Sequence, residues 1–84
     1  MAGLSIFEFA LLEDHSKRNY LIARGTFLMS RRAEKCRVHL YELPGFYVEI
    51  FVDTPAHSSV WYRSFNEPSL LEPYVNNIHL DGLD

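Results

Sequence analysis

Apolar and polar side chains alternate along the middle of the chain, from residue 36 to residue 65. Because successive side chains of a β-strand point to opposite faces of a sheet, this alternation is typical of half-buried antiparallel strands. The pattern predicts strands at residues 36–43, 46–53 and 59–65. Pro44-Gly45 is the expected turn between the first two strands, since proline fixes φ and glycine accepts a positive φ.

The register across this turn decides which side chains share a face of the sheet. A two-residue turn would place Leu43 opposite Phe46 and Tyr41 opposite Val48. A three-residue connection would place Leu40 opposite Val48 and gather six apolar side chains on one face: Cys36, Val38, Leu40, Val48, Ile50 and Val52. A slip of one residue would send that whole set to the other side, so burial should decide, and we favour the second register.

The N-terminal third of the chain is expected to contain one helix and the first strand. Asp14 or Ser16 fits a helix cap, the helix is predicted to end near Arg24, and Gly25 lies just beyond it. A long strand through residues 20–23 is the competing interpretation, and residues 4–12 fit either a short strand or the lead into a helix. A strand at residues 26–32 would complete a four-stranded meander.

A second helix is predicted at residues 69–78. Ser69 and Glu72 have the spacing of a capping box, and apolar residues then recur three and four positions apart at Leu71, Tyr74, Val75 and Ile78. The predicted fold class is therefore α+β, with an N-terminal helix, a four-stranded antiparallel meander and a C-terminal helix in two layers. The 84 residues are expected to form a single domain, with residues 1–12 and 79–84 as terminal segments.

Composition limits the compartment more than the function. A single cysteine excludes an intramolecular disulfide framework and a cysteine metal cluster, and it favours a reducing compartment such as the cytoplasm. Positive charge is absent ahead of Leu4 and Glu8 interrupts the apolar run, so the N-terminal residues do not fit a secretory signal. Nothing approaches the length of a membrane-spanning segment, and no membrane partner is expected.

Several short strings in the chain recur in a known group of proteins. They are GTFL at residues 25–28, LYEL at 40–43, FYVE at 46–49, RSF at 63–65 and LLEPY at 70–74. Together they resemble a family of small uncharacterised bacterial proteins that contain strings of the kind GTFL, LYxLxxFYVE and LLEPY. The resemblance covers most of the chain from Gly25 onward. It implies a bacterial origin and an α+β fold, and it implies no catalytic or binding residue, since no activity is assigned to that family.

If helices cover the aliphatic side of the sheet, the other side combines aromatic rings with polar groups. Such a mixture is typical of surfaces that bind other proteins. The predicted interaction surface consists of His39, Tyr41, Tyr47, Glu49, Phe51, Trp61, Arg63 and Phe65. We expect a non-enzymatic module that forms a homodimer or binds another protein through this surface. The competing interpretation is that a helix covers it, because small domains bury what apolar surface they can.

Two other functions fit parts of the sequence. A cleft near His39, Glu49 and Arg63 would suit a small ligand or a minor hydrolytic activity. Residues 15–37 carry seven basic residues and one acidic residue, a net charge of +6 that suits contact with nucleic-acid phosphates. The whole chain carries −3 and lacks a recognition motif, however, so these basic residues are expected to be solvated and nucleic acid is not the expected partner.

Titratable residues form no motif for a nucleophile, metal or cofactor. Cys36 and His39 are three residues apart, which places them on opposite faces of a strand. Asp53 and His57 flank a loop next to Ser58 and Ser59, but such residues are more typical of turns than of active sites. Four scattered histidines make no metal-binding pattern: His15, His39, His57 and His79. We therefore expect no enzymatic activity, no cofactor and no metal.

Overall fold

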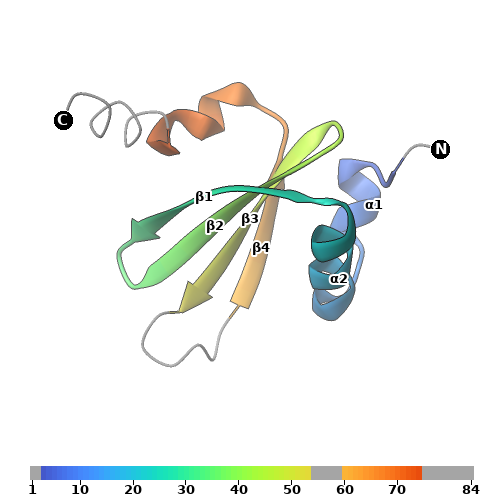
Figure 1. The fold of residues 1–84 in the computed structure, drawn as a ribbon, viewed down its shortest axis with the longest axis horizontal. Coiled ribbons are helices and arrows are strands. Elements are labelled where there is room, and N and C mark those ends of the chain that lie inside the picture. Colours follow the sequence, from blue (N-terminus) through green and yellow to red (C-terminus); the bar gives the residue numbers. More distant parts are fainter. Residues whose placement is uncertain (1–2, 54–59, 75–84) are drawn as a thin grey trace.

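The computed structural model describes residues 3–53 and 60–74. Two helices come first, α1 (Ile6–Ala10) and α2 (Asp14–Arg24), and they precede the four strands β1 (Thr26–Ala33), β2 (Cys36–Leu43), β3 (Phe46–Asp53) and β4 (Val60–Phe65). A 3-10 helix, η1 (Pro68–Leu71), follows. The strands form one antiparallel sheet in the order β1-β2-β3-β4 (Figure 1). The predicted α+β class, the meander and the position of each strand to within one residue are confirmed.

Both N-terminal segments that left a choice between strand and helix are helical. α1 is closed by a capping box, in which the Ser5 hydroxyl accepts from the Glu8 amide and the Glu8 carboxylate accepts from the Ser5 amide. α2 begins after Glu13, whose side chain makes no capping hydrogen bond, so the predicted caps at Asp14 and Ser16 are wrong. The helix ends at Gly25 as predicted, where a Cβ atom would lie only 2.7 Å from the carbonyl oxygen of Leu21.

The turn between β2 and β3 contains two residues, and the predicted three-residue connection is wrong. Leu43 lies opposite Phe46 and Tyr41 lies opposite Val48. Gly45 adopts a φ of +93°, the left-handed conformation that tight hairpin turns require. Burial explains the outcome: Leu43 and Phe46 are both buried beside the turn, and the alternative register would have separated this apolar pair.

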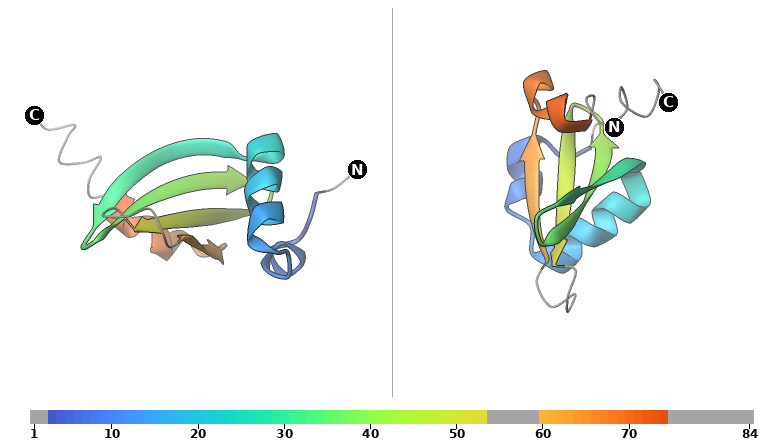
Figure 2. Two further views of the ribbon diagram at one scale, coloured as in Figure 1. Left: turned by 90° about the horizontal axis from the view of Figure 1, so that it is seen from below. Right: turned by 90° about the vertical axis from the view of Figure 1, so that its left-hand side faces the viewer.

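This register gives the sheet two different faces. The helical face packs against α1 and α2 and carries His39, Tyr41, Leu43, Phe46, Val48, Ile50 and Tyr62. The aromatic face carries Val38, Leu40, Tyr47, Glu49, Phe51, Trp61, Arg63 and Phe65. Each face has its own core, because Phe9 and Leu21 bury side chains on the first while Tyr74 packs with Leu40 and Phe65 on the second. Figure 2 shows α1 and α2 together at one end of the sheet, away from the C-terminal helix.

The C-terminal helix consists of η1 and the helical turn that continues to Tyr74. η1 starts after Glu67 without a side-chain cap, and Ser69 lies inside it, so the predicted capping box of Ser69 with Glu72 is wrong. Pro68 occupies the first turn, where its missing N–H costs no hydrogen bond. Leu71 and Tyr74 pack on the aromatic face, whereas the predicted positions 75–78 lie outside the described residues.

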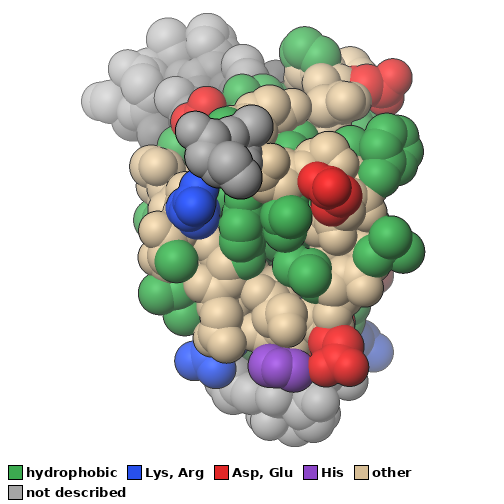
Figure 3. Space-filling model, turned by 90° about the vertical axis from the view of Figure 1, so that its right-hand side faces the viewer, with side chains coloured by type: hydrophobic (Ala, Val, Ile, Leu, Met, Phe, Trp, Pro, Cys, Tyr) green, Lys and Arg blue, Asp and Glu red, His purple; other side chains and the backbone are tan. Residues whose placement is uncertain are grey.

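The outer surface of the N-terminal helices carries isolated apolar side chains. Figure 3 views the molecule from this side and shows hydrophobic side chains among polar ones. Phe7 is 79% exposed and Leu11 is 87% exposed, so α1 is held by its one buried residue, Phe9. Across the described ranges, every helix falls short of the length and hydropathy that crossing a membrane requires.

Candidate functional site

Six of the eight residues predicted as an interaction surface lie together on the aromatic face of β3 and β4. They are Tyr47, Glu49, Phe51, Trp61, Arg63 and Phe65. The other two, His39 and Tyr41, project from β2 onto the helical face, so their placement in this surface was wrong. The cause is the two-residue turn, which changes which residues of β2 share a face with those of β3.

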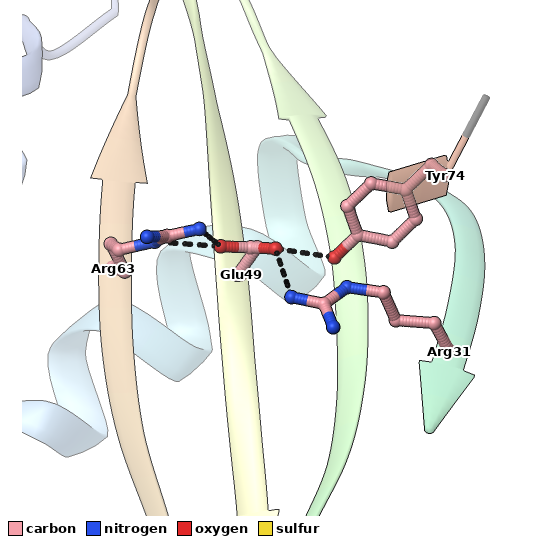
Figure 4. Close-up of polar contacts among 4 residues, drawn as sticks. All are labelled: Arg31, Glu49, Arg63 and Tyr74. Atoms are coloured by element: carbon pink, nitrogen blue, oxygen red, sulfur yellow. Dashed lines mark hydrogen bonds and ion pairs between the residues drawn. The ribbon is translucent and has the colours of Figure 1, made fainter. Parts of the chain in front are cut away.

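Glu49 is the centre of a buried polar cluster on this face (Figure 4). Its side chain is 0% exposed and accepts hydrogen bonds from three other elements. Arg63 Nε on β4 donates to Oε1 at 2.8 Å, and Arg31 Nη2 on β1 donates to Oε2 at 3.3 Å. The Tyr74 hydroxyl of the C-terminal helix donates to Oε2 at 2.6 Å. We call these four residues the Glu49 clamp.

The clamp provides the Glu49 carboxylate with hydrogen bonds and opposite charges, without which its burial would be very unfavourable. An isolated buried charge costs several kcal/mol, and it persists only where opposite charges and hydrogen bonds surround it. Here two guanidinium groups face one carboxylate, which leaves the clamp with a net positive charge. Arg63 is half exposed and displays that charge at the surface. Both oxygens of Glu49 accept donors, and these donors come from three elements.

Arg31 is the more deeply placed of the two arginines. Burial disfavours its charged form, but its contacts with Tyr74 and Glu49 outweigh burial and raise the pKa of the Arg31 guanidinium. The guanidinium also lies over the Tyr74 ring, 5.1 Å from its centroid, a favourable cation–π distance. Its Nε is buried and has no hydrogen-bond partner within the described part of the chain. Arg31 thus ties β1 to the C-terminal helix.

The clamp predicts a loss of stability in alkaline solution. Burial, and then the hydrogen bond to Glu49, raise the pKa of Tyr74 above the ordinary tyrosine value of about 10. Above that pH the unfolded chain loses this proton while the folded chain keeps it, so stability should fall as pH rises. Tyr74→Phe should flatten the fall measured by urea unfolding between about pH 8 and pH 11. An unchanged slope would show that Tyr74 does not cause it.

A row of stacked groups follows β3 and β4 and includes Arg63 of the clamp. Trp61 and Phe51 are parallel, with ring centroids 5.4 Å apart and an angle of 6°. Arg63 lies next, 5.9 Å from the Phe51 centroid and 5.7 Å from the Phe65 centroid. Phe65 then stacks on Tyr47 at 5.5 Å and 25°. We call this row the aromatic ladder. Glu49 holds the Arg63 guanidinium of this ladder in place, so the clamp positions the ladder.

The ladder is closed at one end and open at the other. Phe65 is buried against the C-terminal helix, whereas Trp61 is 46% exposed and Phe51 is partly exposed. The C-terminal helix therefore covers one part of this face, as the competing interpretation expected, and leaves the other part exposed. The open end lies on β4, which is an edge strand of the sheet. An edge strand offers backbone hydrogen-bonding groups to another strand.

His39 lies on the opposite side of the sheet from Glu49 and Arg63. It pairs with Ile50, and its Nδ1 shares a hydrogen bond of 2.7 Å with the Ser30 hydroxyl. Burial, and then the nearby Arg37 charge, lower the pKa of His39. The structure therefore does not bring His39 together with Glu49 and Arg63 in the cleft that the sequence suggested. The prediction that Cys36 and His39 occupy opposite faces is confirmed, since Cys36 pairs with Asp53.

The basic segment at residues 15–37 does not form one surface. Arg31 points to the aromatic face, whereas Arg32 lies opposite Arg37 on the helical face. Lys17 on α2 packs over the rings of Phe9 and Tyr62. Within the described residues, no three His, Cys, Asp or Glu side chains come together as a metal site. The loop residues His57, Ser58 and Ser59 lie outside the described part of the chain.

Sequence reasoning placed Glu49 and Arg63 on one face but missed Arg31 and Tyr74. Glu49 interrupts an otherwise apolar run in a central strand, and a charge at such a position requires partners on neighbouring elements. This signal indicates that further partners exist, but it does not identify them. Arg31 could not be placed from the alternation, because a bulge between Phe27 and Met29 shifts the register of β1.

Comparison with known proteins adds no relative to this geometry. No protein-family model, curated protein or solved structure matches the chain. The resemblance of its short strings to a family of small bacterial proteins therefore stays a prediction.

Proposed function

We propose that this protein is a non-enzymatic self-associating module of the bacterial cytoplasm, and that two copies pair through the β4 edge and the open end of the aromatic ladder. The observation that supports this proposal best is Trp61, an exposed tryptophan held flat against Phe51 on an edge strand. Stacking fixes the ring in advance, so a partner that covers it loses little side-chain freedom on binding. Tryptophan is also the residue type most enriched among energetically dominant interface positions.

The two edges of the sheet differ in how well they are protected against pairing. β1 has a bulge at Leu28 and two consecutive arginines, features that discourage another strand. β4 (Val60–Phe65) has regular pairing, no proline and a single charged residue, Arg63. Val60 and Trp61 are both exposed on it. A second copy of β4 is therefore a suitable occupant of this edge.

Symmetry restricts how two β4 strands can pair. In an antiparallel pair related by a two-fold axis, facing residues must lie on the same side of the extended sheet, so the axis passes through one residue position. An axis at Tyr62 places Trp61 opposite Arg63 of the partner subunit, twice in the dimer, and each contact suits cation–π stacking. An axis at Arg63 would place two guanidinium groups opposite each other, which is unfavourable. We therefore propose the register centred on Tyr62.

Trp61→Lys should convert the dimer to a monomer, because it removes the ring and places a positive charge opposite Arg63 of the partner subunit, twice in the dimer. Phe7→Lys is the matched control, since Phe7 is an exposed aromatic residue on α1, away from β4. Light scattering across a dilution series should report a dimer for the wild type and for Phe7→Lys, and a monomer for Trp61→Lys. Trp61 is the only tryptophan, so its emission should also shift to the red on dilution.

Two results would overturn the proposal. One is a wild-type protein that remains monomeric across the whole dilution series. The other is a Trp61→Lys variant that keeps the mass of the wild type, which would place the interface elsewhere.

A further inference from the structure

On the helical face, away from the aromatic ladder, the structure contains a second surface feature. A groove with a volume of about 360 Å³ lies between α2 and the sheet. This volume lies near the lower end of the range of about 300 to 1,000 Å³ that is typical of small-molecule sites. We infer that this groove binds the acyl chain of an amphipathic carboxylate, such as a medium-chain fatty acid. The inference does not depend on self-association through β4.

The floor of the groove is aliphatic. Ile50 and Val52 project into it from β3, and Val60 projects from β4. Ile22 on α2 forms part of the opposite wall and is 67% exposed, although most isoleucines are buried. These side chains have no hydrogen-bonding groups, so they select a ligand by the apolar area it covers. A flexible hydrocarbon chain fits an elongated surface between a helix and a sheet.

The rim of the groove is basic. Arg18 lines it directly, and Lys17 Nζ lies 5.6 Å from the ring centroid of Tyr62, another lining residue. On the same face of the sheet, Arg37 lies opposite the lining residue Val52. Asp14 is close enough to act on Tyr62. Among the described residues around the groove, Arg18, Lys17 and Arg37 thus outnumber Asp14, which favours a negatively charged head group.

Tyr62 adds a hydrogen-bond donor to this arrangement. Burial, and then the Asp14 charge, raise the pKa of Tyr62, so its hydroxyl stays protonated well beyond neutral pH. A protonated phenol can donate to a carboxylate oxygen. The groove thus combines an apolar floor, cationic groups at the rim and one neutral donor. These are the elements that recognise a fatty acid rather than a neutral lipid or an alkyl cation.

The test is a titration of the full-length protein, followed by NMR of amide and methyl groups. The probes are decanoate, octanoate and decyltrimethylammonium, each kept below its micelle-forming concentration. Decanoate should shift signals of Ile22, Ile50, Val52 and Val60 and leave those of Leu11 unchanged. Each buried methylene raises affinity by roughly fourfold, so decanoate should bind about 15-fold more tightly than octanoate. The cationic analogue should bind at least about tenfold more weakly than decanoate.

Two variants with exposed side chains keep the test independent of folding. Arg18→Glu should weaken decanoate binding by about tenfold, because it reverses the charge at the rim. Ile22→Gln should weaken it by several-fold, whereas the control Leu11→Gln, at the exposed residue that follows α1, should leave it unchanged.

Three results would overturn the inference. The first is the absence of saturable shifts with decanoate, and the second is equal affinity for the cationic analogue. The third is that a single-stranded oligonucleotide, and not decanoate, shifts the groove signals, which would assign the basic rim to nucleic acid. A final experiment adds phosphatidylglycerol vesicles to the decanoate complex. If vesicles compete with decanoate, the groove also accepts the acyl chain of an anionic lipid, which supports the inference.

Discussion

Glu49→Gln should lower the free energy of unfolding by about 3 to 5 kcal/mol, the usual effect of removing one partner of a buried charge pair. Glutamine has nearly the same shape, so the loss would come from charge and hydrogen bonding and not from packing. Arg31 would keep its charge in a largely buried position without a counter-ion. The amide group would also present N–H donors to groups that are themselves donors, at Arg63 or Tyr74.

Glu42→Gln is the matched control for this experiment. Glu42 lies at an exposed position on β2, and its substitution makes the same chemical change. We therefore expect the free energy of unfolding to change by no more than about 0.5 kcal/mol. Urea unfolding followed by circular dichroism would measure both variants. A Glu49→Gln variant as stable as Glu42→Gln would mean that the clamp contributes no net stability.

Phe9→Ala should cost about 3 to 5 kcal/mol, the range for truncating a fully buried aromatic side chain. Phe9 is 0% exposed and is the one buried residue of α1. Its ring lies 6.0 Å from that of Tyr20 on α2 and 5.7 Å from that of Phe46 on β3, so one side chain joins three elements. For a domain whose total stability is on the order of 5 to 15 kcal/mol, this loss would unfold a large fraction of the molecules on mild heating.

Phe7→Ala provides the comparison, because it makes the identical substitution two residues away in the same helix. The Phe7 side chain points to solvent, and its removal should change stability by less than about 0.5 kcal/mol. Thermal unfolding of the two variants side by side would therefore separate burial from helix propensity. Equal melting temperatures for both would contradict the packing of α1 against the sheet.

The elements of the fold could be predicted because each has a local cause. Alternation gives β2 to β4, Pro44-Gly45 gives the hairpin turn, and Gly25 ends α2. The register could not be predicted in the same way. The prediction assumed that one apolar face forms the whole core, whereas Leu43 and Phe46 pack with Phe9 on one face and Leu40 packs with Tyr74 on the other. When both faces are buried, apolar side chains alone do not determine the register.

The same distinction explains which site residues were predicted. Phe51, Trp61 and Arg63 were placed on a common face correctly, because the pairing of β3 with β4 keeps the alternation that the sequence shows. His39 was placed incorrectly because its side depends on the length of the turn before β3. Arg31 reaches Glu49 only because the bulge in β1 reverses the side that it faces.

The Glu49 clamp also bears on how the molecule comes apart. Its members, Arg31, Glu49, Arg63 and Tyr74, are drawn from β1, β3, β4 and the C-terminal helix. A fragment that lacks one of these elements loses either the carboxylate or one of its three donors. Detachment of either edge strand or of the last helical turn would therefore remove a partner of Glu49 and destabilise the rest of the fold. Contacts that join these elements favour cooperative, all-or-none unfolding over stepwise fraying from the ends.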